Sequence, residues 1–351
     1  MRRLTYRAAV LEAITQSMDL DPSIRVIGDS VADPAGTRGA TGLVEKFGPG
    51  RVIRTPLSEE GMTGVAVGMA MRGLRPLQVH IRCDFTLLAA NQLVNMAAKI
   101  RYMYGGRSGG VPLTVWTSIG RSWGQGPQHS QNFAGFFASV PGLRVVMPST
   151  PQDAKDAMAW CLTRSPDPVL FIDHRMLHKI EDDVRESHEP SHGDDWGSQQ
   201  AVGNDLTIVA FSYMNTEARR AVEHLKTLGV SCSLIDPRWL RPFPAATIIA
   251  SDCTVTRRLL VVDCGHPKLG PAAEVVAVVS EILGGGSRPL LDALRMGFAE
   301  TVCPTSHALE ADYYPTARSI AEKAYYMVRG EPMPQWNGSA APEQEEFRGP
   351  F

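Results

Sequence analysis

The fold is decided by residues 51–70, which read RVIRTPLSEEGMTGVAVGMA. Residues 51–54 form a short run with β-branched side chains that is typical of a strand, and a helical pattern begins at Gly61, directly after the acidic pair Glu59 and Glu60. A strand that leads directly into a helix is the repeating unit of an open α/β sheet, and ligands bind at the carboxyl ends of such strands. The segment therefore predicts an α/β fold with a binding site near this junction.

The same alternation continues on both sides of this segment. Short apolar runs alternate with longer helical patterns, which predicts a parallel sheet covered by helices on both faces. The expected strands are Ile24–Ile27, Leu77–Ile81, Leu113–Thr117, Arg144–Met147 and Val169–Asp173. The expected helices are Thr5–Asp19, Gly61–Arg72, Phe85–Tyr104 and Gln152–Arg164. Residues 1–180 are accordingly expected to form one doubly wound domain.

A polar stretch interrupts this pattern. Residues 181–203 are rich in Asp, Glu, His, Ser and Gly, and we expect them to be a linker between domains. Residues 204–330 repeat the alternation and predict a second, smaller doubly wound α/β domain. Its expected elements are strands Leu206–Phe211, Val230–Asp236 and Leu259–Asp263 and helices Thr216–Leu228, Ala272–Leu283 and Thr316–Val328. Residues 331–351 are expected to be a flexible tail.

The composition is that of a globular protein, and it gives no sign of a strongly charged partner. The chain has 351 residues, of which 44% are hydrophobic, and a formal net charge of −2. This balance gives no electrostatic reason to expect binding to nucleic acid or to a membrane surface. No apolar run follows Arg2 and Arg3, so a secretory signal is not expected, and no stretch has the length of a membrane helix. Six scattered cysteines without a C-x-x-C pair indicate reduced thiols in a cytoplasmic protein.

Three segments carry side chains suited to chemistry. Glu59 and Glu60 lie at the start of a predicted helix, where they either contact a ligand or only stabilise the helix through its dipole. His129 lies in the Gly-rich loop 120–131, and it could transfer protons or be an incidental surface residue. Phe85 follows a predicted strand and belongs either to the core or to a ligand-stacking platform. No spacing of histidines or cysteines predicts a metal site on this chain.

Together these segments resemble the β subunit of the thiamine-diphosphate-dependent decarboxylating component of 2-oxoacid dehydrogenases. This is the pyruvate, branched-chain and acetoin dehydrogenase family of the transketolase-like superfamily. The most specific motifs are RVIRTPLSEEG at 51–61, NQLVNMAAK at 91–99, QHSQ at 128–131 and PGLRVVMP at 141–148. The motifs IDPRWLRP at 235–242 and VVDCG at 261–265 extend the resemblance into the second domain. It implies a pyrimidine-binding N-terminal domain and a smaller transketolase-like C-terminal domain.

The resemblance implies a role for each candidate residue. Glu59 would hydrogen-bond the aminopyrimidine ring of thiamine diphosphate and favour the imino tautomer, which removes the proton from the thiazolium carbon. Glu60 is the alternative if the register is shifted by one residue. Phe85 would pack against the aminopyrimidine ring, and Leu57 would also contact the cofactor. His129 would assist proton transfer or acyl transfer to the acceptor.

The resemblance also implies a partner chain. The sequence lacks the G-D-G motif and the Asn-Asn pair with which the family's diphosphate-binding domain anchors magnesium. A separate α subunit would therefore supply magnesium and the diphosphate site, in a heterotetramer of two α and two β chains. A structural potassium ion would be bound by backbone carbonyls near residues 152–164. The assembled enzyme would decarboxylate a 2-oxoacid and transfer the acyl group to a lipoyl carrier on an acyltransferase.

Two alternatives remain open. A split transketolase-like enzyme would move a ketol or acyl unit to a non-lipoyl acceptor, whereas a degenerate chain would only scaffold or regulate the α subunit. The sequence departs from the family pattern at residues 29–30, 80–84 and 121–126, which would fit an unusual 2-oxoacid or an unusual acceptor. Retention of all three candidate site residues favours an enzyme over a scaffold.

Overall fold

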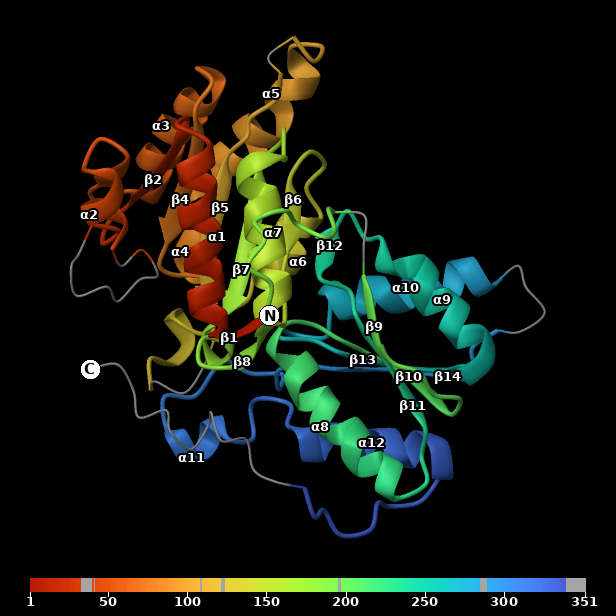
Figure 1. Ribbon diagram of the computed structural model, residues 1–351. Helices are drawn as coiled ribbons and strands as arrows, with labels where there is room; N and C mark the ends of the chain where they lie inside the picture. The colour runs from red at the N-terminus through yellow and green to blue at the C-terminus, as the bar shows by residue number, and fades with distance from the viewer. Residues whose placement is uncertain are drawn as a thin grey trace. The chain divides into compact units, whose positions relative to one another are not determined.

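The chain forms two compact units. The computed structural model describes residues 1–32, 40, 42–107, 109–120, 124–194, 197–284 and 289–338. The first unit consists of residues 1–120 and 136–194, and the second of residues 121–135 and 195–351. Both units are α/β structures, so the predicted fold class is confirmed (Figure 1). The loop 121–135 belongs to the second unit, although the residues on both sides of it belong to the first.

The first unit is built on a parallel sheet. Neighbouring strands within it follow the order β6-β7-β5-β4-β2-β3, and every one of these pairs is parallel. The strands are almost entirely buried, which continuous apolar runs in a parallel sheet require. Their bounds are β2 (Ile24–Gly28), β3 (Val52–Arg54), β4 (Arg75–His80), β5 (Thr114–Ile119), β6 (Arg144–Val146) and β7 (Val169–His174).

Helices pack around this sheet, and two of them begin with a capping threonine. α1 packs against α7, and α3 packs against β4. The Thr5 side chain caps α1 by accepting from the Ala8 amide, and Thr150 caps α7 in the same way ahead of Pro151. The bounds are α1 (Tyr6–Leu20), α2 (Leu43–Phe47), α3 (Glu59–Met71), α6 (Ala134–Ala138), α7 (Pro151–Thr163) and the 3₁₀ turn η4 (Arg175–Leu177).

The segment predicted as one helix, Phe85–Tyr104, is divided in the structure. It consists of α4 (Cys83–Thr86), the 3₁₀ turn η1 (Leu87–Ala89), the π-helix η2 (Gln92–Ala97) and α5 (Ala98–Met103). A π-helix bonds residue i to i+5 and so changes the helical repeat locally. The spacing of apolar residues in the sequence does not reveal such a change, which explains why a single helix was predicted.

The polar stretch predicted as a linker contains two strands. β8 (Glu181–Val184) pairs antiparallel with β1 (Arg2–Thr5) in the first unit. β9 (Ser198–Ala201) pairs antiparallel with β11 (Cys232–Asp236) in the second unit. Their side chains are mostly polar, so the hydrophobic pattern gave no sign of them.

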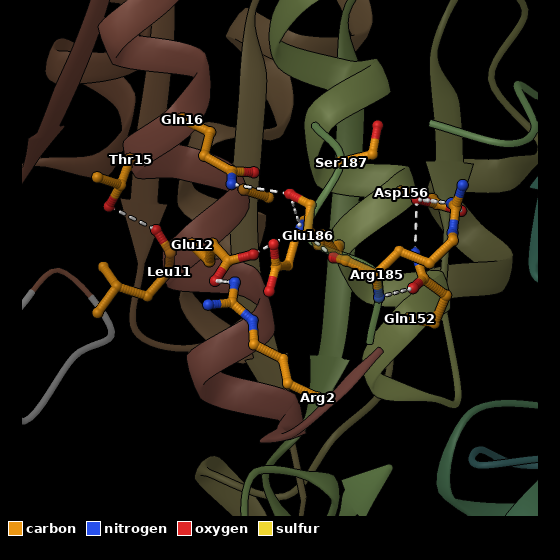
Figure 2. Close-up of polar contacts among 12 residues, drawn as sticks. Arg2, Leu11, Glu12, Thr15, Gln16, Gln152, Asp156, Arg185, Glu186 and Ser187 are labelled. Carbon is orange, nitrogen blue, oxygen red and sulfur yellow. Dashed lines mark hydrogen bonds and ion pairs between the residues drawn. The ribbon is translucent and has the colours of Figure 1, made fainter. Parts of the chain in front are cut away.

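Paired charges hold the chain that follows β8 to the first unit. The ammonium group of buried Lys155 donates to the Glu12 carboxylate at 2.5 Å and to the Arg185 carbonyl at 2.6 Å. The Arg185 guanidinium binds Asp156 at 2.9 Å, and its backbone amide donates to the Gln152 side chain at 2.8 Å (Figure 2). Because a buried ammonium without partners would cost several kcal/mol, these contacts explain how α7 tolerates Lys155 in its buried face.

The second unit has a smaller sheet with helices on both faces. Its strands follow the order β14-β13-β10-β11-β9, parallel except for β9. α9 packs with α10 on one face and α8 with α12 on the other (Figure 1). The bounds are η3 (Gly126–Gln128), β10 (Leu206–Ala210), α8 (Tyr213–Thr227), β11 (Cys232–Asp236), β12 (Trp239–Arg241), α9 (Ala245–Thr256), β13 (Arg258–Val262), α10 (Pro271–Gly284), β14 (Asp292–Met296), α11 (His307–Glu310) and α12 (Ala317–Arg329).

Among the elements of this unit that were not predicted from the sequence are α9 and β14. α9 reads AATIIASDCTVT, and its β-branched residues do not favour a helix, so packing against α10 and the sheet decides its conformation. β14 reads DALRM and has too few apolar residues to be recognised as a strand. Across the described ranges, none of the helices has both the length and the apolar character needed to cross a membrane.

Candidate active site

A cavity in the first unit lies at the carboxyl ends of three neighbouring strands. β3 pairs with one edge of β2 and β4 with the other, so the direction of the chain across the sheet reverses at β2. Open α/β sheets bind their ligands at such a reversal. The empty space at this site, counted out into the solvent at its open mouth, is about 430 Å³. Its lining residues are Gly28, Asp29, Ser30, Val31, Thr55, Pro56, Leu57, Ser58, Glu59, Met62, Gln78, Val79, His80 and Ile81.

Glu59 lies at the first position of α3 and lines the cavity. It is half-buried, and its backbone carbonyl accepts a hydrogen bond of 2.6 Å from the Thr63 hydroxyl. Glu60 is exposed and is not among the lining residues; its carboxylate accepts from the Asn91 amide at 3.2 Å. The two acidic residues therefore have different surroundings, and Glu59 is the one placed to contact a ligand in this cavity.

The wall opposite β3 carries a buried histidine that we did not single out as a site residue. His80 ends β4, is only 4% exposed, and has its two ring nitrogens 3.5 Å from the Thr63 hydroxyl and 3.3 Å from the Thr86 hydroxyl. Burial lowers the pKa of His80 to about 4, so the ring is neutral at physiological pH. The cavity wall therefore contains a neutral imidazole bound to threonine hydroxyls, in addition to the Glu59 carboxylate.

This burial predicts an acid-dependent loss of stability. The unfolded chain takes up a proton at His80 near pH 6.5 and the folded chain only near pH 4, so stability falls as the pH drops between these values. Relative to pH 7.5, His80 should cost about 2 kcal/mol at pH 5. We expect the denaturation midpoint of His80→Gln to fall less on acidification than that of the unmodified chain. ¹³C-histidine NMR should show His80 still neutral at pH 5, and titration of this ring near pH 6.5 would contradict the prediction.

Of the remaining predicted residues of the first unit, Leu57 lines the cavity and Phe85 does not. Leu57 lines it and is 73% exposed, which is unusual for a large apolar side chain. Phe85 lies on α4, five residues after the end of β4, and is half-buried. It is not among the residues that line the cavity. The structure therefore brings Leu57 and Glu59 together, and a stacking role for Phe85 stays a prediction.

His129 belongs to the second unit. It follows the 3₁₀ turn η3, and its backbone amide donates to the Gly126 carbonyl at 3.4 Å. Its side chain is half-buried. Gly126 has φ +66°, and a Cβ at this position would lie 2.6 Å from the Thr305 hydroxyl oxygen, so the turn requires glycine. His129 thus lies on a closely packed loop, and its part in the reaction stays a prediction.

Comparisons with known proteins identify the family. The model of the transketolase pyrimidine-binding domain matches residues 2–180, and that of the transketolase C-terminal domain matches residues 196–320. The β subunit of acetoin:2,6-dichlorophenolindophenol oxidoreductase from Cupriavidus necator is 34% identical over 348 residues, covering 94% of this chain and 98% of that one. This chain belongs to the pyruvate and acetoin dehydrogenase β-subunit family.

Further relatives agree with this membership. The pyruvate dehydrogenase E1 component subunit beta-1 from Arabidopsis thaliana, a mitochondrial protein, is 38% identical over 284 residues, covering 80% of this β subunit and 77% of the relative. Among solved structures, a split-gene transketolase described as an inactive beta4 tetramer matches with a TM-score of 0.72. It covers 93% of this chain and 99% of the other at 18% identity, which shows a shared fold and no more.

The carbonyls at the end of α7 in this β subunit already face a cation. The Arg75 guanidinium donates to the carbonyls of Leu162, Ser165 (2.8 Å) and Cys161 (3.4 Å). Burial lowers the pKa of Arg75, although nearby Asp21 opposes this effect. Because Arg75 already binds these three carbonyls, a potassium ion near this helix would need other oxygen atoms. Among the described residues, no three His, Cys, Asp or Glu side chains are grouped as they would be around a metal.

Several cavity residues of this β subunit, which lie on β4 or directly after β2, were not predicted as site residues from the sequence. His80 and Gln78 line the cavity from β4, and Asp29 and Ser30 from the end of β2. The sequence marked Asp29, Ser30 and His80 only as departures from the family pattern, and it gave no sign of Gln78. For Asp29, Ser30 and His80, a position at or near the end of a predicted strand was the available signal, whereas Gln78 lies near the start of one. The loop residues 121–123, also noted as a departure, lie outside the described part of the chain.

Proposed function

We propose that this β subunit supplies the aminopyrimidine-binding half of a thiamine-diphosphate site in a 2-oxoacid dehydrogenase. The observation that carries the proposal is the position of Glu59 in a cavity at the reversal point of a parallel sheet. A carboxylate and neutral polar groups in a small cavity suit a flat heterocycle that has hydrogen-bond donors and acceptors. Gln78 adds a further group, because its buried side-chain oxygen has no hydrogen-bond partner within the described residues.

Each residue of the cavity has a role in this proposal. Glu59 holds a proton at the ring nitrogen of the cofactor and thereby fixes its tautomer. Neutral His80, hydrogen-bonded to threonine hydroxyls, shapes the wall without adding a charge that would compete with Glu59. When bound, thiamine diphosphate supplies the carbon nucleophile that attacks a 2-oxoacid. His129, in the same proposal, moves a proton during decarboxylation or acyl transfer to a lipoyl carrier on an acyltransferase.

Exposed apolar side chains on and around α3 support a partner chain. The exposed side chains Leu57, Val65, Leu88 and Met96 lie at the start of α3, on α3 itself, and on η1 and η2, which pack against α3. A Cβ at Gly68 would meet no atom within 4 Å, so this helix face is open to close approach. Exposed apolar surface of this kind marks protein interfaces. We propose that a separate α subunit covers it, brings magnesium and the diphosphate site, and completes a cytoplasmic heterotetramer of two α and two β chains.

A binding experiment tests the split site. The β subunit is purified alone and also together with a candidate α subunit from the same organism, and thiamine diphosphate with magnesium is titrated into each by calorimetry. We expect binding only to the co-purified complex, because this chain holds one end of the cofactor. A dissociation constant in the micromolar range corresponds to about 8 kcal/mol, which a half-site would not reach.

The outcomes separate the proposal from its alternatives. Tight binding to the β subunit alone would contradict the split site. Absence of binding in both samples would favour a scaffolding subunit without cofactor. Binding in the complex, followed by turnover of a 2-oxoacid with an artificial electron acceptor, would support the dehydrogenase over a transketolase-like transfer.

A further inference from the structure

The loop that carries His129 is fixed to the second unit before and after the histidine. Before it, Gly126 lies so close to Thr305 that a Cβ would be 2.6 Å from the hydroxyl oxygen. After it, a Cβ on Gly135 would be 3.0 Å from Cδ of Pro271 and 3.3 Å from Cα of the preceding glycine. A Cβ at either glycine would therefore lie closer than ordinary van der Waals contact, which shows how closely the backbone packs there. Steric contact therefore confines both ends of the loop.

Asn132 makes polar contacts between these two ends. Its side-chain amide nitrogen donates to the Cys264 carbonyl at 3.0 Å. Its side-chain oxygen accepts from the Ala134 backbone amide at 2.9 Å, at the start of α6. One amide thus uses its donor and its acceptor in two directions, which fixes its orientation. Asn132 connects the chain three residues after His129 to the turn that follows β13.

The turn that receives this hydrogen bond is itself held firmly. The buried carboxylate of Asp263 accepts from the Ala272 amide at 3.0 Å and from the backbone amides of Cys264 and Gly265. A Cβ on Gly270 would lie 2.6 Å from the His266 carbonyl, so the turn closes tightly on itself. The Cys264 carbonyl is therefore a fixed acceptor, and a side chain bound to it is fixed as well.

We infer that Asn132 is a positioning residue for His129, acting through its hydrogen bond to the Cys264 carbonyl. The inference rests on the proposed proton-transfer role of His129. Asn132 does not need to touch substrate, since it sets the position of the loop and the loop sets the position of the imidazole. Proton transfer depends steeply on geometry, and a displacement of about 1 Å can cost on the order of 100-fold in rate. The two steric contacts confine the ends of the loop, and Asn132 fixes its register between them.

Two substitutions separate positioning from helix capping. Asn132→Asp keeps an oxygen for the Ala134 amide and loses the donor to Cys264, whereas Asn132→Ala loses both. In the complex with the α subunit, both variants should lower kcat for 2-oxoacid turnover by roughly tenfold or more, with KM little changed. Exchange of the C2 proton of bound thiamine diphosphate should keep its normal rate in both, which also shows that the variant complexes assemble.

A third variant, His129→Ala, is measured in the same assays. It distinguishes a failure of the inference about Asn132 from a failure of the proposed role of His129. Wild-type kcat in Asn132→Asp would overturn the inference, because it would mean that Asn132 only caps α6. Wild-type kcat in both Asn132 variants with a large loss in His129→Ala would also overturn it, while leaving the role of His129 intact. Wild-type kcat in His129→Ala itself would overturn the proposed role of that histidine, and the inference with it.

Discussion

Glu59→Gln should lower the rate of cofactor activation by roughly 100- to 10,000-fold, the range in which positioned acid–base groups contribute. The substitution keeps the size and shape of the side chain but removes the group that can hold a proton at the ring. Glu59 lines the cavity from the first turn of α3, so neither the helix nor the surface around it should change. Assembly with the α subunit and the affinity for thiamine diphosphate should therefore stay close to normal.

The measurement is exchange of the C2 proton of bound thiamine diphosphate with deuterium, followed by quenched-flow NMR on the assembled complex. Glu60→Gln is the matched control, because this neighbour is exposed and its carboxylate faces Asn91 instead of the cavity. It should exchange at the normal rate. Normal exchange in Glu59→Gln would contradict the assignment of this residue, and a loss confined to Glu60→Gln would mean that the register is shifted by one position.

The strand-to-helix junction at Glu59 could be predicted because its signal is local, whereas the role of Glu59 came from the resemblance alone and stays a prediction. Residues 51–61 contain a strand, a turn and a helix start in direct succession, and each is set by propensities and by the acidic pair at the helix N-terminus. The structure has β3 at Val52–Arg54 and begins α3 at Glu59. The predicted helix began at Gly61, two residues later, which is the usual uncertainty at helix ends. A strand-to-helix junction of this kind can be predicted from the sequence without knowing which strands are neighbours in the sheet.

What the sequence could not provide depends on contacts between distant segments. His80 becomes a cavity residue only because β4 pairs with β2, about 50 residues earlier in the chain. The loop 121–135 was expected in the first domain, and its grouping with the second unit rests on contacts with Cys264, Pro271 and Thr305. No periodicity in the loop encodes partners that lie more than 130 residues away.

His129→Ala should lower kcat for 2-oxoacid turnover by roughly 100-fold or more, while the affinity for thiamine diphosphate changes by no more than about threefold. The imidazole is a side chain that can both donate and accept a proton near neutral pH, which alanine cannot. The loop should keep its conformation, since its contacts with Thr305, Cys264 and Pro271 do not involve the His129 side chain.

Steady-state kinetics of the assembled enzyme, together with calorimetric titration of the cofactor, checks this prediction. Gln128→Ala is the matched control, since Gln128 is the exposed neighbour on the same turn and should tolerate the change. A loss of turnover with normal cofactor affinity and normal C2 exchange would place His129 after cofactor activation, in decarboxylation or acyl transfer. Equal losses of turnover and affinity would instead identify a histidine that supports the loop, because a group that acts only in the transition state leaves ground-state binding unchanged.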